Sequence, residues 1–287
     1  MSDKFNRLQP QLRVPCCYQG GKQRVSKELV DRIFDTCSID ETTRFYDLCC
    51  GSGAYTVELL NKGIRPENIT MLDKSSWGVF WRAVGLGAFD TDTFKEMLNK
   101  IPEDKREVKH HVSHLAEKPI GEDECYVFLL LQTCSFGGKQ IWNDGKKWRN
   151  AFFRDYWEPK EGSVRKSPAN PMQPSPKTLL DRLNLLVEKA RGVSCVHEDI
   201  SWILSQDVLP NSVVYMDPPY RKTTGYAFGF DVDDFITKFK ARSSVPFFVS
   251  EGMPLSDDAV QLSFGGAKGG ISGNKSSKHQ EWLSRIE

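Results

Sequence analysis

Short apolar runs alternate along this chain with stretches of helical periodicity, and this alternation constrains the fold more than any other feature of the sequence. Strands that alternate with helices favour βαβ units and a mainly parallel sheet. We therefore predict an α/β fold with helices on both faces of the sheet. Strands are expected over residues 44–49, 69–72, 193–197, 213–216, 245–249, 259–264 and 282–286, and helices over residues 26–36, 55–62, 77–86, 178–191 and 231–240.

The segment 91–177 breaks this alternation and is predicted to be an insertion into an α/β domain that comprises residues 1–90 and 178–287. Residues 134–166 carry eight Lys or Arg against four Asp or Glu, although the whole chain has a net charge of only +1. Seven aromatic residues lie in the same stretch, and we expect Trp142 or Trp148 to reach the surface. A basic stretch with interleaved aromatic residues is typical of nucleic-acid binding.

Glycines or an acid follow four of the predicted strands. The first strand leads into Gly51 and Gly53, and three others lead into Asp73, Asp199 and Asp217. Because ligands of open α/β sheets bind beyond the carboxyl ends of the strands, we expect these residues to meet in one site.

The glycines after the first strand permit a tight turn and a close approach of the backbone to a ligand. Asp73 follows about twenty residues later, where an acid hydrogen-bonds ribose hydroxyls. This pattern fits NAD, FAD or S-adenosylmethionine. The third glycine of a dinucleotide fingerprint is missing, because Thr56 follows Tyr55, and there is no phosphate-binding lysine of the P-loop kind.

The sequence Asp217-Pro218-Pro219-Tyr220 directly follows a predicted strand. An exocyclic amine is a poor nucleophile because its lone pair is delocalised into the aromatic base. A carboxylate and a backbone carbonyl can accept hydrogen bonds from the amine and stabilise the positive charge that develops on nitrogen. The prolines stiffen the turn and carry no competing N–H, and the tyrosine offers a face for stacking. These four residues predict a site that activates the amino group of a base.

Together these sequences resemble the Dam-type DNA adenine-N6 methyltransferases, which use S-adenosylmethionine. The resemblance extends over nearly the whole chain and follows the motif order of the family. Leu48 and Cys49 depart from it, because the family usually has Pro-Phe there. The matching parts are Tyr18-Gln19-Gly20-Gly21-Lys22, the turn at 47–55, Asp73, the basic insertion, Asp199, the DPPY sequence with its continuation to Tyr226, and the Gly/Ser/basic loop at 265–278.

The resemblance implies a Rossmann-like class I methyltransferase domain, a mixed sheet whose last strands are antiparallel, and a target-recognition role for the insertion. It implies that Asp73 binds the cofactor ribose and that Asp199 binds its adenine. The catalytic residues, which would hold the flipped adenine, are then Asp217, Pro218, Pro219 and Tyr220. The cofactor-binding residues are Tyr18, Gly21, Lys22, Asp47, Cys49, Gly51, Gly53, Asp73, Asp199, Ile200 and Asp217.

We therefore expect site-specific methylation of adenine N6 in duplex DNA, with S-adenosylhomocysteine as the other product. Methylation of RNA adenine or of cytosine N4 remains open, as does a catalytically inactive nucleic-acid-binding scaffold. A partner endonuclease, as in restriction–modification systems, also remains open. DNA contacts are expected at Lys139, Lys146, Lys147, Arg149, Lys268 and Lys275.

No metal is expected, because the leaving group of this reaction is already a neutral thioether. The eight cysteines form no C-x-x-C pair, which is consistent with reduced thiols. The longest apolar runs are far shorter than the ~20 residues of a membrane-spanning helix. We expect a cytoplasmic protein of a bacterium or of its phage, with no membrane partner.

Overall fold

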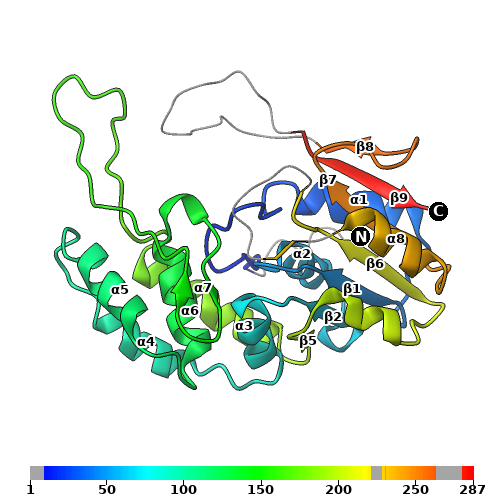
Figure 1. The fold of residues 1–287 in the computed structure, drawn as a ribbon, viewed down its shortest axis with the longest axis horizontal. Helices are drawn as coiled ribbons and strands as arrows, with labels where there is room; N and C mark the ends of the chain where they lie inside the picture. Colours follow the sequence, from blue (N-terminus) through cyan, green and yellow to red (C-terminus); the bar gives the residue numbers. More distant parts are fainter. Residues whose placement is uncertain (1–9, 221–227, 230, 263–279) are drawn as a thin grey trace.

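The computed structural model describes residues 10–220, 228–229, 231–262 and 280–287. A seven-stranded sheet lies at its centre, in the order β5-β2-β1-β6-β7-β9-β8 (Figure 1). The first five strands in that order are parallel, whereas β9 is antiparallel to both β7 and β8. The predicted α/β sheet, mostly parallel with antiparallel last strands, is confirmed. Its strands are β1 (Arg44–Leu48), β2 (Ile69–Leu72), β5 (Ser194–Val196), β6 (Ser212–Met216), β7 (Phe247–Glu251), β8 (Val260–Gln261) and β9 (Trp282–Ile286).

The helices begin and end where local sequence favours it. Ser175 caps α7 by accepting a hydrogen bond from the Thr178 N–H, and Pro176 occupies the first turn, where it interrupts no hydrogen bond. Leu179 and Leu183 then form the buried stripe of that helix. The helices are α1 (Ser26–Thr36), α2 (Ala54–Asn61), α3 (Ser76–Gly85), α4 (Thr91–Asn99), α5 (Val108–Glu117), α6 (Glu124–Cys134), α7 (Pro176–Lys189) and α8 (Val232–Lys240), with 3-10 turns η1 (Pro66–Asn68), η2 (Phe136–Gly138) and η3 (Ile200–Ser205).

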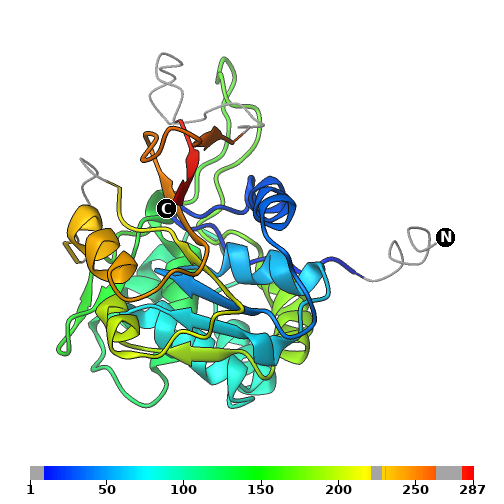
Figure 2. The same cartoon turned by 90° about the vertical axis from the view of Figure 1, so that its right-hand side faces the viewer.

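Helices cover both faces of the sheet, as Figure 2 shows for α1 (dark blue) and α8 (orange). The alternation of side chains along each strand divides the core accordingly. In β6, Val213 and Tyr215 belong to the cluster that includes α1, α2 and α3. Val214 and Met216 belong to the cluster formed with α8 and η3. The predicted Rossmann-like arrangement of a parallel sheet between two helical layers is thus present.

Strand β7 lies two residues further along the chain than predicted. Ser250 and Glu251, which follow the predicted strand, are buried within β7 at 0% and 2% exposure. Each polar side chain has a local partner, which makes its burial tolerable. The Tyr215 hydroxyl lies 2.8 Å from the Ser250 hydroxyl, and the Gly252 N–H donates to Glu251 Oε1 at 2.8 Å.

The inserted segment contributes α4, α5, α6 and a hairpin of β3 (Trp142–Asn143) and β4 (Trp148–Arg149). Part of the chain between α6 and α7 projects from the body as an extended loop (Figure 1). Helix α6 shares a core with the α/β domain, because Phe128 packs edge-on against Trp77 of α3. Trp148 is buried against Phe128, whereas Trp142 is only partly buried, so of these two candidates for the surface the structure leaves Trp142. In the described part of the chain, no helix is both long and apolar enough to cross a membrane.

Candidate active site

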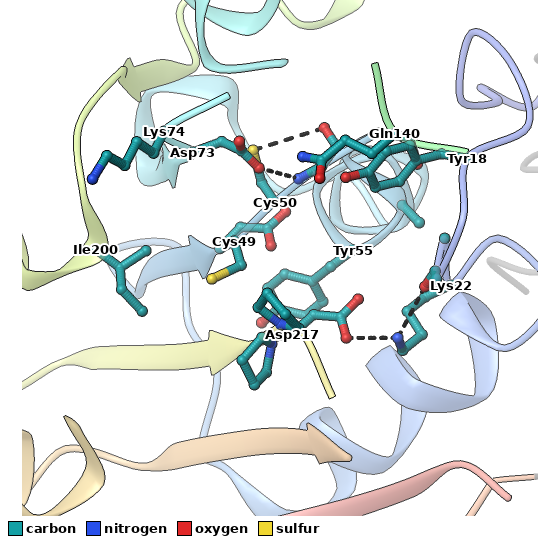
Figure 3. Close-up of a pocket in the computed structure, with 18 of the residues that line it drawn as sticks. Tyr18, Lys22, Cys49, Cys50, Tyr55, Asp73, Lys74, Gln140, Ile200 and Asp217 are labelled. Atoms are coloured by element: carbon teal, nitrogen blue, oxygen red, sulfur yellow. Dashed lines mark hydrogen bonds and ion pairs between the residues drawn. The ribbon is translucent and has the colours of Figure 1, made fainter. Parts of the chain in front are cut away.

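A cavity that opens to solvent lies at the carboxyl ends of β1, β2 and β6 (Figure 3). The glycine turn and the three predicted acids meet there, although they are far apart in the sequence. Of the predicted cofactor and catalytic residues, Gly53 and Tyr220 lie outside the lining. Those that line the cavity are Tyr18, Gly21, Lys22, Asp47, Cys49, Gly51, Asp73, Asp199, Ile200, Asp217, Pro218 and Pro219.

The glycine turn is fixed by its neighbours rather than being an open loop. The Gly51 N–H donates to Asp73 Oδ2 at 2.7 Å, and Trp81 Nε1 donates to the Gly51 carbonyl at 3.1 Å. Gly53 adopts φ +76°, and a Cβ there would lie 2.2 Å from the Trp81 ring. Gly53 therefore serves the packing behind the cavity wall, whereas Gly51 forms the wall itself.

The two acids assigned to the cofactor nucleoside lie on one side of the cavity. Asp73 Oδ1 accepts hydrogen bonds from the N–H and the hydroxyl of Ser75, at 2.8 and 2.6 Å. A carboxylate accepts about four hydrogen bonds, so after these two and the Gly51 N–H it can accept another from a hydroxyl. Asp199 caps η3 through the Ser201 N–H, lies 3.4 Å from Lys74 Nζ and is half exposed.

Asp47 is almost completely buried at the end of β1. Its Oδ2 accepts hydrogen bonds from the Thr56 hydroxyl at 2.7 Å and from the Thr56 N–H at 3.3 Å. Asp47 thereby holds the first turn of α2 against the glycine turn. Burial raises the pKa of Asp47 to about 7, although the bond to Thr56 opposes the shift.

Asp217 forms an ion pair with Lys22, whose Nζ lies 2.6 Å from Asp217 Oδ1. The second carboxylate oxygen points toward the cavity (Figure 3). Burial raises the pKa of Asp217 to about 7, while Lys22 lowers it and the Glu281 charge raises it. This carboxyl group therefore titrates near neutral pH.

Tyr220 lies beside the cavity lining, next to the same lysine. Lys22 Nζ lies over its ring, 4.7 Å from the centroid, so a stacked base would use the opposite face. The Tyr220 hydroxyl donates to Glu281 Oε1. The ring is therefore held from its edge and from one face.

The residues near this site that were not predicted from the sequence include Lys74, Gln140 and Glu281. Gln140 brings the inserted segment into the cavity wall, and its turn is shaped by Gln132. Gln132 Nε2 donates to the Lys139 carbonyl at 3.0 Å, and Gln132 Oε1 accepts from the Ile141 N–H at 3.0 Å. Glu281 could have been predicted, because it is an acid directly before the last predicted strand. Nothing in the sequence indicates that Gln140 lines the cavity.

The predicted DNA contacts either lie outside the cavity lining or fall outside the described residues. Lys139, Lys146 and Lys147 are exposed. Arg149 pairs with Asp144, whose Oδ1 also accepts the N–H groups of Lys146 and Lys147 at 3.0 Å. The DNA-binding role of these side chains stays a prediction. Lys268 and Lys275, and the loop at 265–278, lie outside the described part of the chain.

Within the described ranges, no group of three or more His, Cys, Asp or Glu side chains is arranged to hold a metal ion.

The chain matches no protein-family model, and no curated protein matches it.

Proposed function

We propose that this chain is an S-adenosylmethionine-dependent methyltransferase that acts on adenine N6 of a flipped base in duplex DNA. One observation carries the proposal. The Asp217-Pro218-Pro219 turn lines the same cavity as Gly51, Asp73 and Asp199. A site for activating a base amine thus adjoins a site suited to a nucleoside cofactor.

The charge of the cavity favours a cationic cofactor. Four carboxyl groups line it, from Asp47, Asp73, Asp199 and Asp217, against the ammonium groups of two lysines. This surplus suits a sulfonium and disfavours the pyrophosphate of NAD or FAD. The Gly51 N–H, which a pyrophosphate would use, already donates to a carboxylate.

Each part of the cofactor has matching residues in the cavity. Asp73 retains the capacity to accept a ribose hydroxyl, and the half-exposed carboxylate of Asp199 is suited to accept from an adenine amino group. Tyr18 and Gly21 line the side where the methionine part would lie. When bound, S-adenosylmethionine supplies an electrophilic methyl group that leaves a neutral thioether behind.

Asp217 and the turn that follows it would hold and activate the target amine. The carboxylate oxygen that points toward the cavity accepts a hydrogen bond from the amine, as does the Pro218 carbonyl. Both interactions strengthen as positive charge develops on nitrogen, so they favour the transition state over the ground state. Holding the amine in line with the methyl group contributes further acceleration through positioning.

Duplex DNA as the substrate is supported by the composition of the inserted segment. A base within a duplex must be flipped out, at a cost of a few kcal/mol, and the protein must hold the strands meanwhile. The exposed Lys139, Lys146 and Lys147 are suited to phosphate contacts. The inserted segment also contributes Gln140 to the cavity, which links the proposed DNA surface to the cofactor site.

The test is methyl transfer from isotopically labelled S-adenosylmethionine to unmethylated duplex DNA, followed by digestion to nucleosides and mass spectrometry. N6-methyladenine is the expected product, and sequencing of the modified positions then gives the recognition site. Detection of N4-methylcytosine would support the same mechanism with cytosine instead of adenine as the target base. Absence of any methylated nucleoside, on DNA or on RNA, from protein with bound cofactor would refute the proposed reaction.

A further inference from the structure

Glu281 is a buried carboxylate to which the proposed mechanism gives no role. It directly precedes β9, and its side chain is 5% exposed. Because β9 is antiparallel to β7, its first residues lie at the sheet edge where the parallel strands end. Glu281 therefore reaches the catalytic edge from the opposite chain direction to that of Asp217.

Lys22 lies between these two carboxylates. Its Nζ is 2.6 Å from Asp217 Oδ1, 3.6 Å from Glu281 Oε1 and 3.0 Å from the Gly20 carbonyl. Lys22 thus donates hydrogen bonds to Asp217 and to the Gly20 carbonyl, and the Glu281 carboxylate lies within ion-pair distance of the same ammonium group. Held in this way, Lys22 engages one Asp217 oxygen and leaves the other pointing toward the cavity (Figure 3).

Glu281 also fixes the aromatic ring of the DPPY sequence. It accepts a hydrogen bond from the Tyr220 hydroxyl, while Lys22 covers one face of that ring. One carboxylate thus contacts both the tyrosine and the lysine that border Asp217. A buried acid is costly unless it is paired, and here its partners are the neighbours of the reacting group.

We propose that Glu281 is a positioning residue, which orients the Tyr220 ring for the base and holds Lys22 so that one Asp217 oxygen remains available to the amine. This inference rests on the proposed function for the identity of the amine. Without the Glu281 charge, the Lys22 ammonium group is attracted by Asp217 alone of these two carboxylates and approaches it more closely. Lys22 then compensates more of the negative charge of Asp217, and the Asp217 carboxylate becomes a weaker hydrogen-bond acceptor.

Several groups determine the titration of Asp217. Among the described residues, Lys22 favours the ionised form, whereas Glu281 and Glu251 disfavour it. Loss of the Glu281 charge should therefore lower the pKa of Asp217, and closer approach of Lys22 acts in the same direction. The other groups that face Asp217 are Asp47 from β1, Cys49, Tyr215 from β6 and Tyr220.

The test is Glu281→Gln, which keeps an acceptor oxygen for the Tyr220 hydroxyl and removes the charge near Lys22. We expect kcat at pH 8 to fall roughly tenfold, less than for loss of a group that touches the substrate, with little change in the KM for DNA. The acid limb of the kcat profile should move down by about one pH unit. Merely loosened packing would lower the rate equally at every pH. Glu188→Gln, the same change at a residue whose side chain is 67% exposed on α7, is the matched control.

Two further measurements keep the inference falsifiable. Tyr220→Phe removes the donor to Glu281 but keeps the ring, and its effect should be less than additive with that of Glu281→Ala, because each of the two changes removes the same hydrogen bond. A ¹³C NMR titration of Asp217, assigned with Asp217→Asn, should show the lower pKa without any methyl transfer.

The outcomes separate the two proposals. If the wild type methylates no nucleic acid, the proposed function fails, and the NMR titration still decides the role of Glu281. If Glu281→Gln retains both the wild-type kcat and the wild-type titration of Asp217, the role of Glu281 is refuted.

Discussion

Replacing Asp217 by Asn tests the proposed catalytic centre most directly. The substitution preserves the size of the side chain but replaces two acceptor oxygens by one acceptor and one donor. Lys22, 2.6 Å from Oδ1, would attract the remaining oxygen. The amide NH₂ group would then point toward the cavity, where it meets the donor hydrogens of the target amine.

The magnitude follows from these two effects. Removal of one group that stabilises charge in the transition state costs about 10²–10³-fold in kcat, or roughly 3–4 kcal/mol. The opposed donors add to this, so we expect a loss of at least about 10²-fold. Binding of S-adenosylmethionine should weaken only moderately, because Asp73 and Asp199 are unchanged.

The assay is single-turnover methylation of duplex DNA at saturating cofactor, with cofactor affinity from calorimetry and folding checked by thermal unfolding. An Asp217→Asn protein that is folded, binds cofactor and turns over within about fivefold of the wild type would refute the assignment of Asp217. A parallel loss of cofactor binding and activity would instead place Asp217 mainly in the cofactor site.

Three other predictions follow from particular contacts. Gly53→Ala should destabilise the fold by about 2–4 kcal/mol in chemical denaturation, because φ is +76° and the new Cβ would meet the Trp81 ring at 2.2 Å; unchanged stability would contradict that packing. Burial raises the pKa of Asp47 to about 7, so its contribution to stability is complete below its ordinary pKa of 3.8 and lost as the pH rises through 7. The melting temperature should therefore rise from pH 8 to pH 6 more in the wild type than in Asp47→Asn, and equal changes would argue against the shift. Replacing Lys146 and Lys147 by Ala should reduce the salt dependence of DNA binding, lowering the slope of log K against log salt by about 2; an unchanged slope would locate the DNA surface elsewhere.

Much of the fold could be predicted because periodicity and burial agree along most of the chain. Helix α1 spans Ser26–Thr36, the residues that the pattern indicates. Strand β7 extends beyond the predicted apolar run because its polar residues Ser250 and Glu251 find partners within the core. Trp142 and Trp148 stayed alternatives because the composition of a basic segment does not show which aromatic rings its own core requires, and the structure buries Trp148.

The site was predictable to the extent that it depends on strand ends. Asp73 and Asp217 converge because all parallel strands end at one edge of the sheet. Glu281 was not predicted because the strand-end pattern selects residues that follow parallel strands. A residue before an antiparallel strand lies at the same edge of the sheet. Gln140 could not be placed, because its position depends on how the inserted turn packs against the cavity.

Strand β9 also protects the sheet from intermolecular pairing. A chain truncated before Trp282 would leave β7 as an edge strand, and every residue of β7 is buried in the complete fold. Exposed apolar edges recruit other chains, so such a product is expected to aggregate during synthesis rather than accumulate as an inactive monomer. Since Glu281 directly precedes the same strand, pairing of β9 with β7 both covers this edge and brings Glu281 beside Lys22.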